Sequence, residues 1–106
     1  MIRIPTSTES AWFSQTVQLA GTLLRMELHW NARAGFWVMN LATVDREPIV
    51  SGVRIVPDWD LVGRLADPRL PKGRLVAADQ SGRGEPPGRD ELGSRVILYF
   101  IPEEEL

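Results

Sequence analysis

Residues 22–43 hold the pattern that most constrains the fold of this chain. Two apolar runs with alternating side chains, residues 22–30 and 36–43, flank five residues that include Asn31 and Gly35. This pattern is typical of a β-hairpin with a short loop. We expect Gly35 to take a positive φ at the end of the loop, because only glycine does so at little steric cost.

The two strands of this hairpin differ in how their side chains are distributed. Successive side chains of a strand point to opposite faces, so the first strand has one apolar and one polar face. Its apolar face carries Leu24, Met26, Leu28 and Trp30, and its polar face carries Arg25, Glu27 and His29. The second strand is apolar on nearly both faces. We therefore expect it to be internal and covered on both sides, with the first strand half exposed.

Composition limits the class of protein. The 106 residues predict one domain, and 43% hydrophobic content with four tryptophans suits a core without a metal or disulfide. There is no cysteine, which excludes disulfides, thiolate zinc sites and a cysteine nucleophile. The net charge of −2 gives no electrostatic argument for nucleic acid or an anionic membrane. With no signal peptide and no apolar run near ~20 residues, we expect a soluble intracellular protein.

Further strands are predicted on both sides of the hairpin. They cover residues 2–4, 12–19, 48–56, 74–78 and 94–101. A tight turn at residues 20–22 would join the second of these to the hairpin as a three-stranded meander. Pro5 would end an edge strand in the N-terminal arm, residues 1–10, and Gly52 indicates a bulge. The last strand is apolar on both faces and is therefore expected to be central.

The remaining segments predict one short helix, a long loop and a charged tail. Asp58 is placed to cap a helix over residues 58–65, followed by apolar residues at helical spacing. Residues 79–93 are rich in Gly and Pro and predict a surface loop, flexible or ordered by a neighbouring subunit. Residues 102–106 form an acidic tail. The class is mostly β: a small barrel or sandwich of six to seven antiparallel strands.

Few residues suggest catalysis. His29 is the only histidine and has no evident partners for a metal site or a nucleophile, so we interpret it as a surface histidine. Asp58 and Asp60 are more simply a helix cap and a charge favoured by the helix dipole. Residues 82–88 lack the Gly-Lys-Ser/Thr ending of a phosphate-binding loop. We expect no catalytic residue, no metal and no cofactor.

Aromatic and basic residues suggest contacts instead. The four tryptophans favour core packing over a platform for sugars or single-stranded nucleic acid. Asn31, Arg33 and Trp37 are placed to lock the hairpin loop by hydrogen bonds and stacking. The candidate structural and interaction residues are Trp30, Asn31, Arg33, Gly35, Trp37, Trp59, Arg69, Lys72 and Tyr99.

An ordered set of short motifs adds a resemblance. The stretch from Arg25 to Leu41 resembles the small baseplate plug proteins of tailed phages with minimal contractile tails, in which a strand ending in Trp-Asn is followed by a short loop with Arg and Gly, then Trp and a strand. The later motifs, in order, are Pro48-Ile49 with Gly52, Asp60-Leu61, Leu70-Pro71 with Gly73 and Leu75, Glu91-Leu92-Gly93, and Leu98-Tyr99-Phe100. The resemblance covers roughly residues 12–101.

The resemblance implies a structural virion component that is not an enzyme. It would lie near the tail axis at the junction of tube, hub and spike, in several copies around a symmetry axis, after synthesis in the host cytoplasm. The family supplies no catalytic residues. Two other readings of the residues stay open: a carbohydrate- or peptide-binding module that uses Trp30, Trp37 and the loop after Asp79, and a small β-barrel enzyme with Asp58, Asp60 and His29 in a cleft.

A local basic patch generates one prediction about assembly. Arg64, Arg69, Lys72 and Arg74 surround two prolines, while the C-terminus is acidic, and this asymmetry suggests that the patch meets an acidic partner such as the tail of a neighbouring copy. On this hypothesis, Arg69→Glu with Lys72→Glu weakens assembly, measured as the mass of the particle in solution. Unchanged assembly would refute it.

Overall fold

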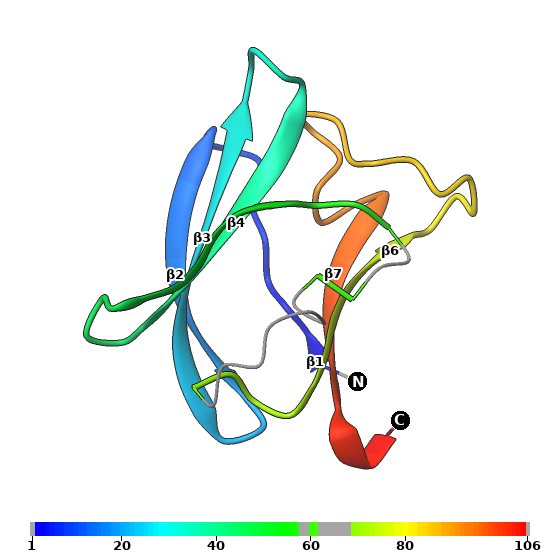
Figure 1. Ribbon diagram of the computed structural model, residues 1–106. Helices are drawn as coiled ribbons and strands as arrows, with labels where there is room; N and C mark the ends of the chain where they lie inside the picture. Colours follow the sequence, from blue (N-terminus) through cyan, green and yellow to red (C-terminus); the bar gives the residue numbers. More distant parts are fainter. Residues whose placement is uncertain (1, 58–59, 62–68, 106) are drawn as a thin grey trace.

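The computed structural model describes residues 2–57, 60–61 and 69–105. This part of the chain holds seven strands in two antiparallel sheets, of order β2-β3-β4-β5 and β1-β7-β6 (Figure 1). The elements are β1 (Ile2–Arg3), β2 (Trp12–Leu19), β3 (Thr22–Asn31), β4 (Phe36–Thr43), β5 (Pro48–Arg54), β6 (Gly73–Asp79), β7 (Val96–Pro102) and the 3-10 helix η1 (Glu103–Glu105). The predicted mostly β class is confirmed, as a sandwich and not a barrel, because neither sheet closes on itself.

The predicted meander is confirmed. β2 joins β3 through a two-residue turn in which both Ala20 and Gly21 have positive φ, 50° and 81°. Such a turn matches the right-handed twist of the strands that it connects. At the other end of β3, Gly35 has the expected positive φ of 77° before β4 begins.

β5 pairs with β4 as the fourth strand of the sheet. A bulge interrupts this pairing, as Gly52 predicted. The register between β4 and β5 shifts on both sides of Leu41, and Gly52 has a φ of 76°. The backbone N–H of Gly52 donates to the side-chain oxygen of Asn40 at 2.8 Å. The bulge therefore keeps its backbone donor satisfied while it bends the sheet edge.

The smaller sheet is built around β7, which confirms the prediction that the last strand is central. The short β1 is an edge strand that pairs with β7. The Ile4 N–H extends this contact by donating to the Leu98 carbonyl at 2.9 Å, and the Ile4 side chain is buried. The start of the N-terminal arm is therefore a fixed part of the sheet.

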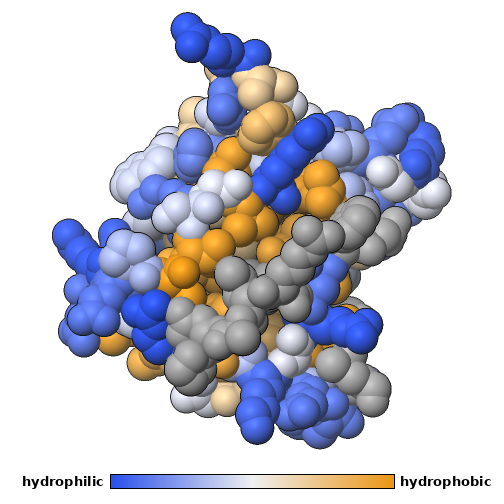
Figure 2. Space-filling model, viewed as in Figure 1, coloured by the Kyte–Doolittle hydropathy of each residue, from blue (hydrophilic) through white to orange (hydrophobic). Residues whose placement is uncertain are grey.

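The core fills the space between the two sheets, where apolar side chains are visible in the middle of one face of the molecule (Figure 2). Leu24, Met26 and Leu28 of β3 point inward and are at most 1% exposed. β4 is internal, as expected, because it lies between β3 and β5, but its outer face is covered only in part. Val38 is buried, but Asn40 and Ala42 line a pocket on the outer face. The described residues form no third layer over this sheet.

The predicted short helix falls mostly outside the described residues. Asp58, Trp59 and residues 62–65 are not described, so the proposed helix cap is not tested. Asp60 forms an isolated bridge with Val76 of β6, and Leu61 lies in a turn. The helical element among the described residues is η1, which contains the three glutamates of the acidic tail.

Replacement of Trp37 by alanine tests the central position of the hairpin. Trp37 is fully buried, and truncation of a buried tryptophan costs about 3–5 kcal/mol, a large part of the ~5–15 kcal/mol that a domain has in total. We expect a large fall in the midpoint of thermal or urea unfolding. Trp12→Ala is the matched control, because Trp12 is 53% exposed and its loss should change stability little. Equal effects of the two substitutions would contradict the assignment.

Candidate interaction surfaces

The end of the β3–β4 hairpin is shaped by Asn31. Its side-chain oxygen accepts a hydrogen bond from the Ala34 N–H at 3.0 Å, and its carbonyl accepts one from the Gly35 N–H at 2.7 Å. Arg33 lies at the tip between these two contacts and is exposed. Asn31 and Gly35 thus set the loop conformation, and Arg33 is the charged side chain that the loop presents to solvent.

Below the tip, three aromatic rings form a cluster. Trp37 meets Trp30 at 5.8 Å between ring centroids and Phe13 at 6.5 Å, both edge to face. The indole N–H of Trp37 donates to the Gly88 carbonyl at 3.0 Å, and the Arg89 guanidinium lies 5.5 Å from the ring centroid. Core packing is confirmed for Trp37, which leaves no exposed face of this ring for a sugar or a base.

The long loop is tied together by ionic groups at its two ends. Arg95 contacts the Asp79 carboxylate at 2.8 Å and the Glu91 carboxylate at 2.7 Å. It also donates to the carbonyls of Glu85 and Pro86. The sequence pattern did not indicate this network and predicted only a loop that is flexible or ordered by a neighbouring subunit. The signal available was an acidic and a basic residue at the two ends of a Gly- and Pro-rich segment.

These contacts change the proton affinity of the two acids. Hydrogen bonds from the Ser81 hydroxyl, the backbone N–H groups of Glu85 and Ser81, and Arg95 hold the pKa of Asp79 well below its ordinary 3.8, although desolvation opposes them. Its side chain is only 2% exposed. The Arg95 guanidinium holds the pKa of Glu91 below its ordinary 4.5. Both carboxylates therefore stay ionised in the folded protein under conditions where free ones take up protons.

One residue of the basic patch, Lys72, lies beside the acidic tail of the same chain. Arg69 pairs with Glu47 at 3.8 Å on the surface, and Lys72 is exposed. The Glu103 N–H donates to the Lys72 carbonyl at 3.2 Å, which fixes the start of the tail beside the patch. Arg64 and Trp59 lie outside the described residues.

Tyr99 is half-buried in the middle of β7. It pairs with Arg3 on one side and with Val76 on the other. This position makes Tyr99 part of the smaller sheet.

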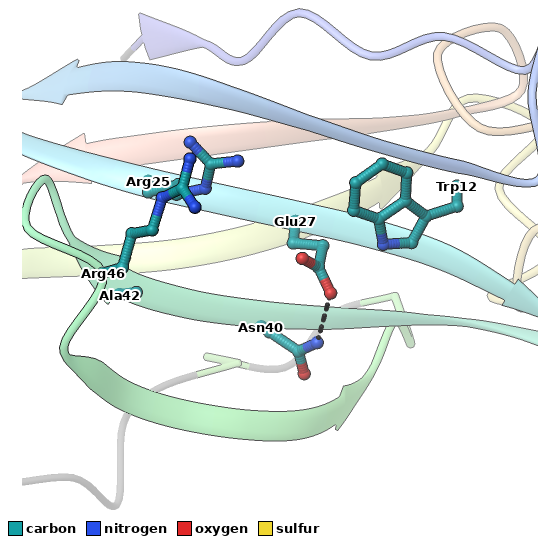
Figure 3. A pocket seen from close by; sticks show the side chains of 6 residues that line it. All are labelled: Trp12, Arg25, Glu27, Asn40, Ala42 and Arg46. Atoms are coloured by element: carbon teal, nitrogen blue, oxygen red, sulfur yellow. Dashed lines mark hydrogen bonds between the residues drawn. The ribbon is translucent and has the colours of Figure 1, made fainter.

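A further surface, which the sequence did not predict, is an open pocket on the outer face of the larger sheet (Figure 3). Its cavity volume is about 340 Å³. The alternation along β3 had placed two residues of the pocket, Arg25 and Glu27, on the polar face of that strand. It did not show which residues of other strands lie beside them. The pocket is lined by Trp12, Arg25, Glu27, Asn40, Ala42 and Arg46.

The two catalytic candidates on described residues pair with strands of different sheets. His29 is part of β3, whereas Asp60 bridges to β6 of the smaller sheet. The described residues contain no group of three or more His, Cys, Asp or Glu side chains arranged to hold a metal ion. Nor does that part of the chain contain a helix long and apolar enough to cross a membrane.

The fold defines the class of the protein as a small, mostly β sandwich of two antiparallel sheets. The sequence model of a family described as "Cyanophage baseplate Pam3 plug gp18" matches residues 1–103. The chain belongs to this family of phage baseplate plug proteins. No curated protein matches it.

The ionic network of the long loop predicts how stability depends on pH. Because the folded-state pKa values of Asp79 and Glu91 are depressed, their contribution is complete above the unfolded values of about 3.8 and 4.5 and is lost as pH falls below them. We expect the melting temperature of the wild type to drop steeply below about pH 4.5. Asp79→Asn should lower the melting temperature at neutral pH and flatten this drop.

Asp45→Asn is the matched control, because Asp45 is an exposed turn residue. It should leave both the neutral value and the pH profile unchanged. If Asp79→Asn melts like the wild type from neutral to acidic pH, the network does not hold the loop.

Proposed function

We propose that the protein is a plug of a phage tail baseplate that lies near the tail axis and joins tube, hub and spike proteins. The observation that carries the proposal is the family match, which spans nearly the whole chain. In this role the protein acts as a structural part of the virion, without catalysis, a cofactor or nucleic-acid recognition. It is made in the host cytoplasm and enters the particle during assembly as several copies around a symmetry axis.

The arrangement of the surfaces supports an adaptor role. The exposed tip of the β3–β4 hairpin and the C-terminal η1 lie at opposite ends of the molecule (Figure 1). The open pocket adds a third surface on the outer side of the larger sheet. A small domain that joins different neighbours needs separate surfaces of this kind, and loops and sheet faces on a packed core provide them.

Antibody labelling of virions under the electron microscope tests the location. Particles of the phage or prophage that encodes the chain are labelled before and after mild disruption of the tail tip, with pre-immune serum as control. We expect label only at the tail tip, and stronger label once the axis is exposed. Label along the tube, at the head, or on no particle after disruption would refute the proposal.

A further inference from the structure

The pocket on the outer face of the larger sheet has a floor that is already organised. Glu27 and Asn40 are cross-strand partners, and the Asn40 amide donates to the Glu27 carboxylate at 3.0 Å (Figure 3). The other side of the amide accepts the Gly52 N–H. The polar floor is thus held by its own hydrogen bonds, and a ligand does not need to order it.

The two arginines of the pocket have fewer polar partners than the residues of its floor. Arg25 pairs across the strands with Ala42, and Arg46 reaches over the same end from the turn that follows β4 (Figure 3). Arg25 donates one hydrogen bond to the Ser14 hydroxyl. Within the described residues, neither guanidinium has an ion-pair partner within 4.0 Å. Two arginines and one carboxylate give the pocket a net positive charge in a chain whose net charge is −2.

The wall of the pocket favours a side chain over a free ion. Trp12 is 53% exposed and stands at the end away from the arginines (Figure 3). An exposed indole covers aliphatic carbons, while guanidiniums bind carboxylates, often with two hydrogen bonds. A glutamate side chain combines both features. The chemistry of the pocket therefore fits an acidic peptide segment.

The described chain contains such a segment. The exposed Glu103 and Glu104 follow β7 in η1, at the end of the smaller sheet. The hydrogen bond from the Glu103 N–H to Lys72 fixes the tail to this sheet, away from the pocket on the outer face of the other sheet. The tail that enters the pocket must then come from a second copy.

We propose that the acidic tail of one copy binds in the Trp12–Arg25–Arg46 pocket of the next. Donor and acceptor surfaces differ, so the contact is heterologous, and repetition closes a ring or extends a filament. The proposal rests on the multimeric role given above and names its contact. It also differs from the Arg69–Lys72 hypothesis, which assigns the same tail to a patch that already lies beside the tail of its own chain.

Charge reversal on the purified full chain tests the contact. Mass is measured by light scattering after size-exclusion chromatography, over a concentration series and at two salt concentrations. We expect a multimer that dissociates at high salt, because exposed ion pairs are screened. Arg25→Glu with Arg46→Glu should weaken association by about tenfold or more. Arg54→Glu with Arg83→Glu gives the same net charge at exposed sites outside the pocket and should associate like the wild type.

Exchange of the charges between tail and pocket distinguishes a specific contact from a general effect of net charge on association. Glu103→Arg with Glu104→Arg should weaken association alone and restore it when combined with the two pocket reversals. A circular dichroism melt of each variant shows that the fold is intact. The proposal is overturned if the pocket variant associates like the wild type, if Arg69→Glu with Lys72→Glu is the pair that dissociates the multimer, or if the wild type is a monomer throughout.

The same experiment distinguishes this proposal from the baseplate role. A wild-type monomer, together with antibody label at the tail tip, rejects the self-contact and keeps the baseplate location. A multimer that depends on Arg25 and Arg46, together with particles that carry no label, keeps the contact and rejects the location.

Discussion

The burial of Trp37 is the contact on which the rest of this structure depends. The ring lies at the end of the β3–β4 hairpin, inside the sandwich, and packs edge to face against Trp30 and Phe13. Its indole N–H bonds to Gly88, which belongs to the loop between β6 and β7. One side chain therefore joins the larger sheet to the segment that connects two strands of the smaller one. The Trp37 carbonyl adds a backbone bond from Ile55 at 3.0 Å.

The long loop shows how a segment without regular structure keeps a defined shape. Backbone polar groups outside strands still need partners, and here charged side chains supply several of them. Asp79 accepts from the N–H groups of Ser81 and Glu85, and Arg95 donates to two carbonyls of the same loop. The Gln80 N–H closes the base of the loop on the Arg95 carbonyl at 2.7 Å. Glycines and prolines determine the course of the loop backbone, while the ion pair of Asp79 with Arg95 holds the two ends of the loop together.

The sequence predicted the features that depend on local pattern. Alternation and turn residues were enough for the strand at 12–19, the hairpin, the Gly52 bulge and the central place of β7. Beyond the three-stranded meander, it did not predict which strands share a sheet, because that choice depends on tertiary packing. For the same reason it missed the meeting of Asp79 with Arg95 and the open pocket. The apolar content of β4 suggested that other residues cover both of its faces. Whether the outer face is covered depends on the presence of a third layer, which a strand's own sequence does not show.

The two faces of the larger sheet have different roles: the inner face packs the core, and the outer face is available for contacts. Leu24 and Met26 point into the core, whereas Arg25 between them points to the outer face. Because one face supplies the packing, the residues of the other face can differ in charge and shape at little cost to folding. A protein that must fit between several neighbours benefits from this division, since contacts on the outer face depend on side chains that the core does not use. Assembly and folding are then separable by substitution at adjacent positions of one strand.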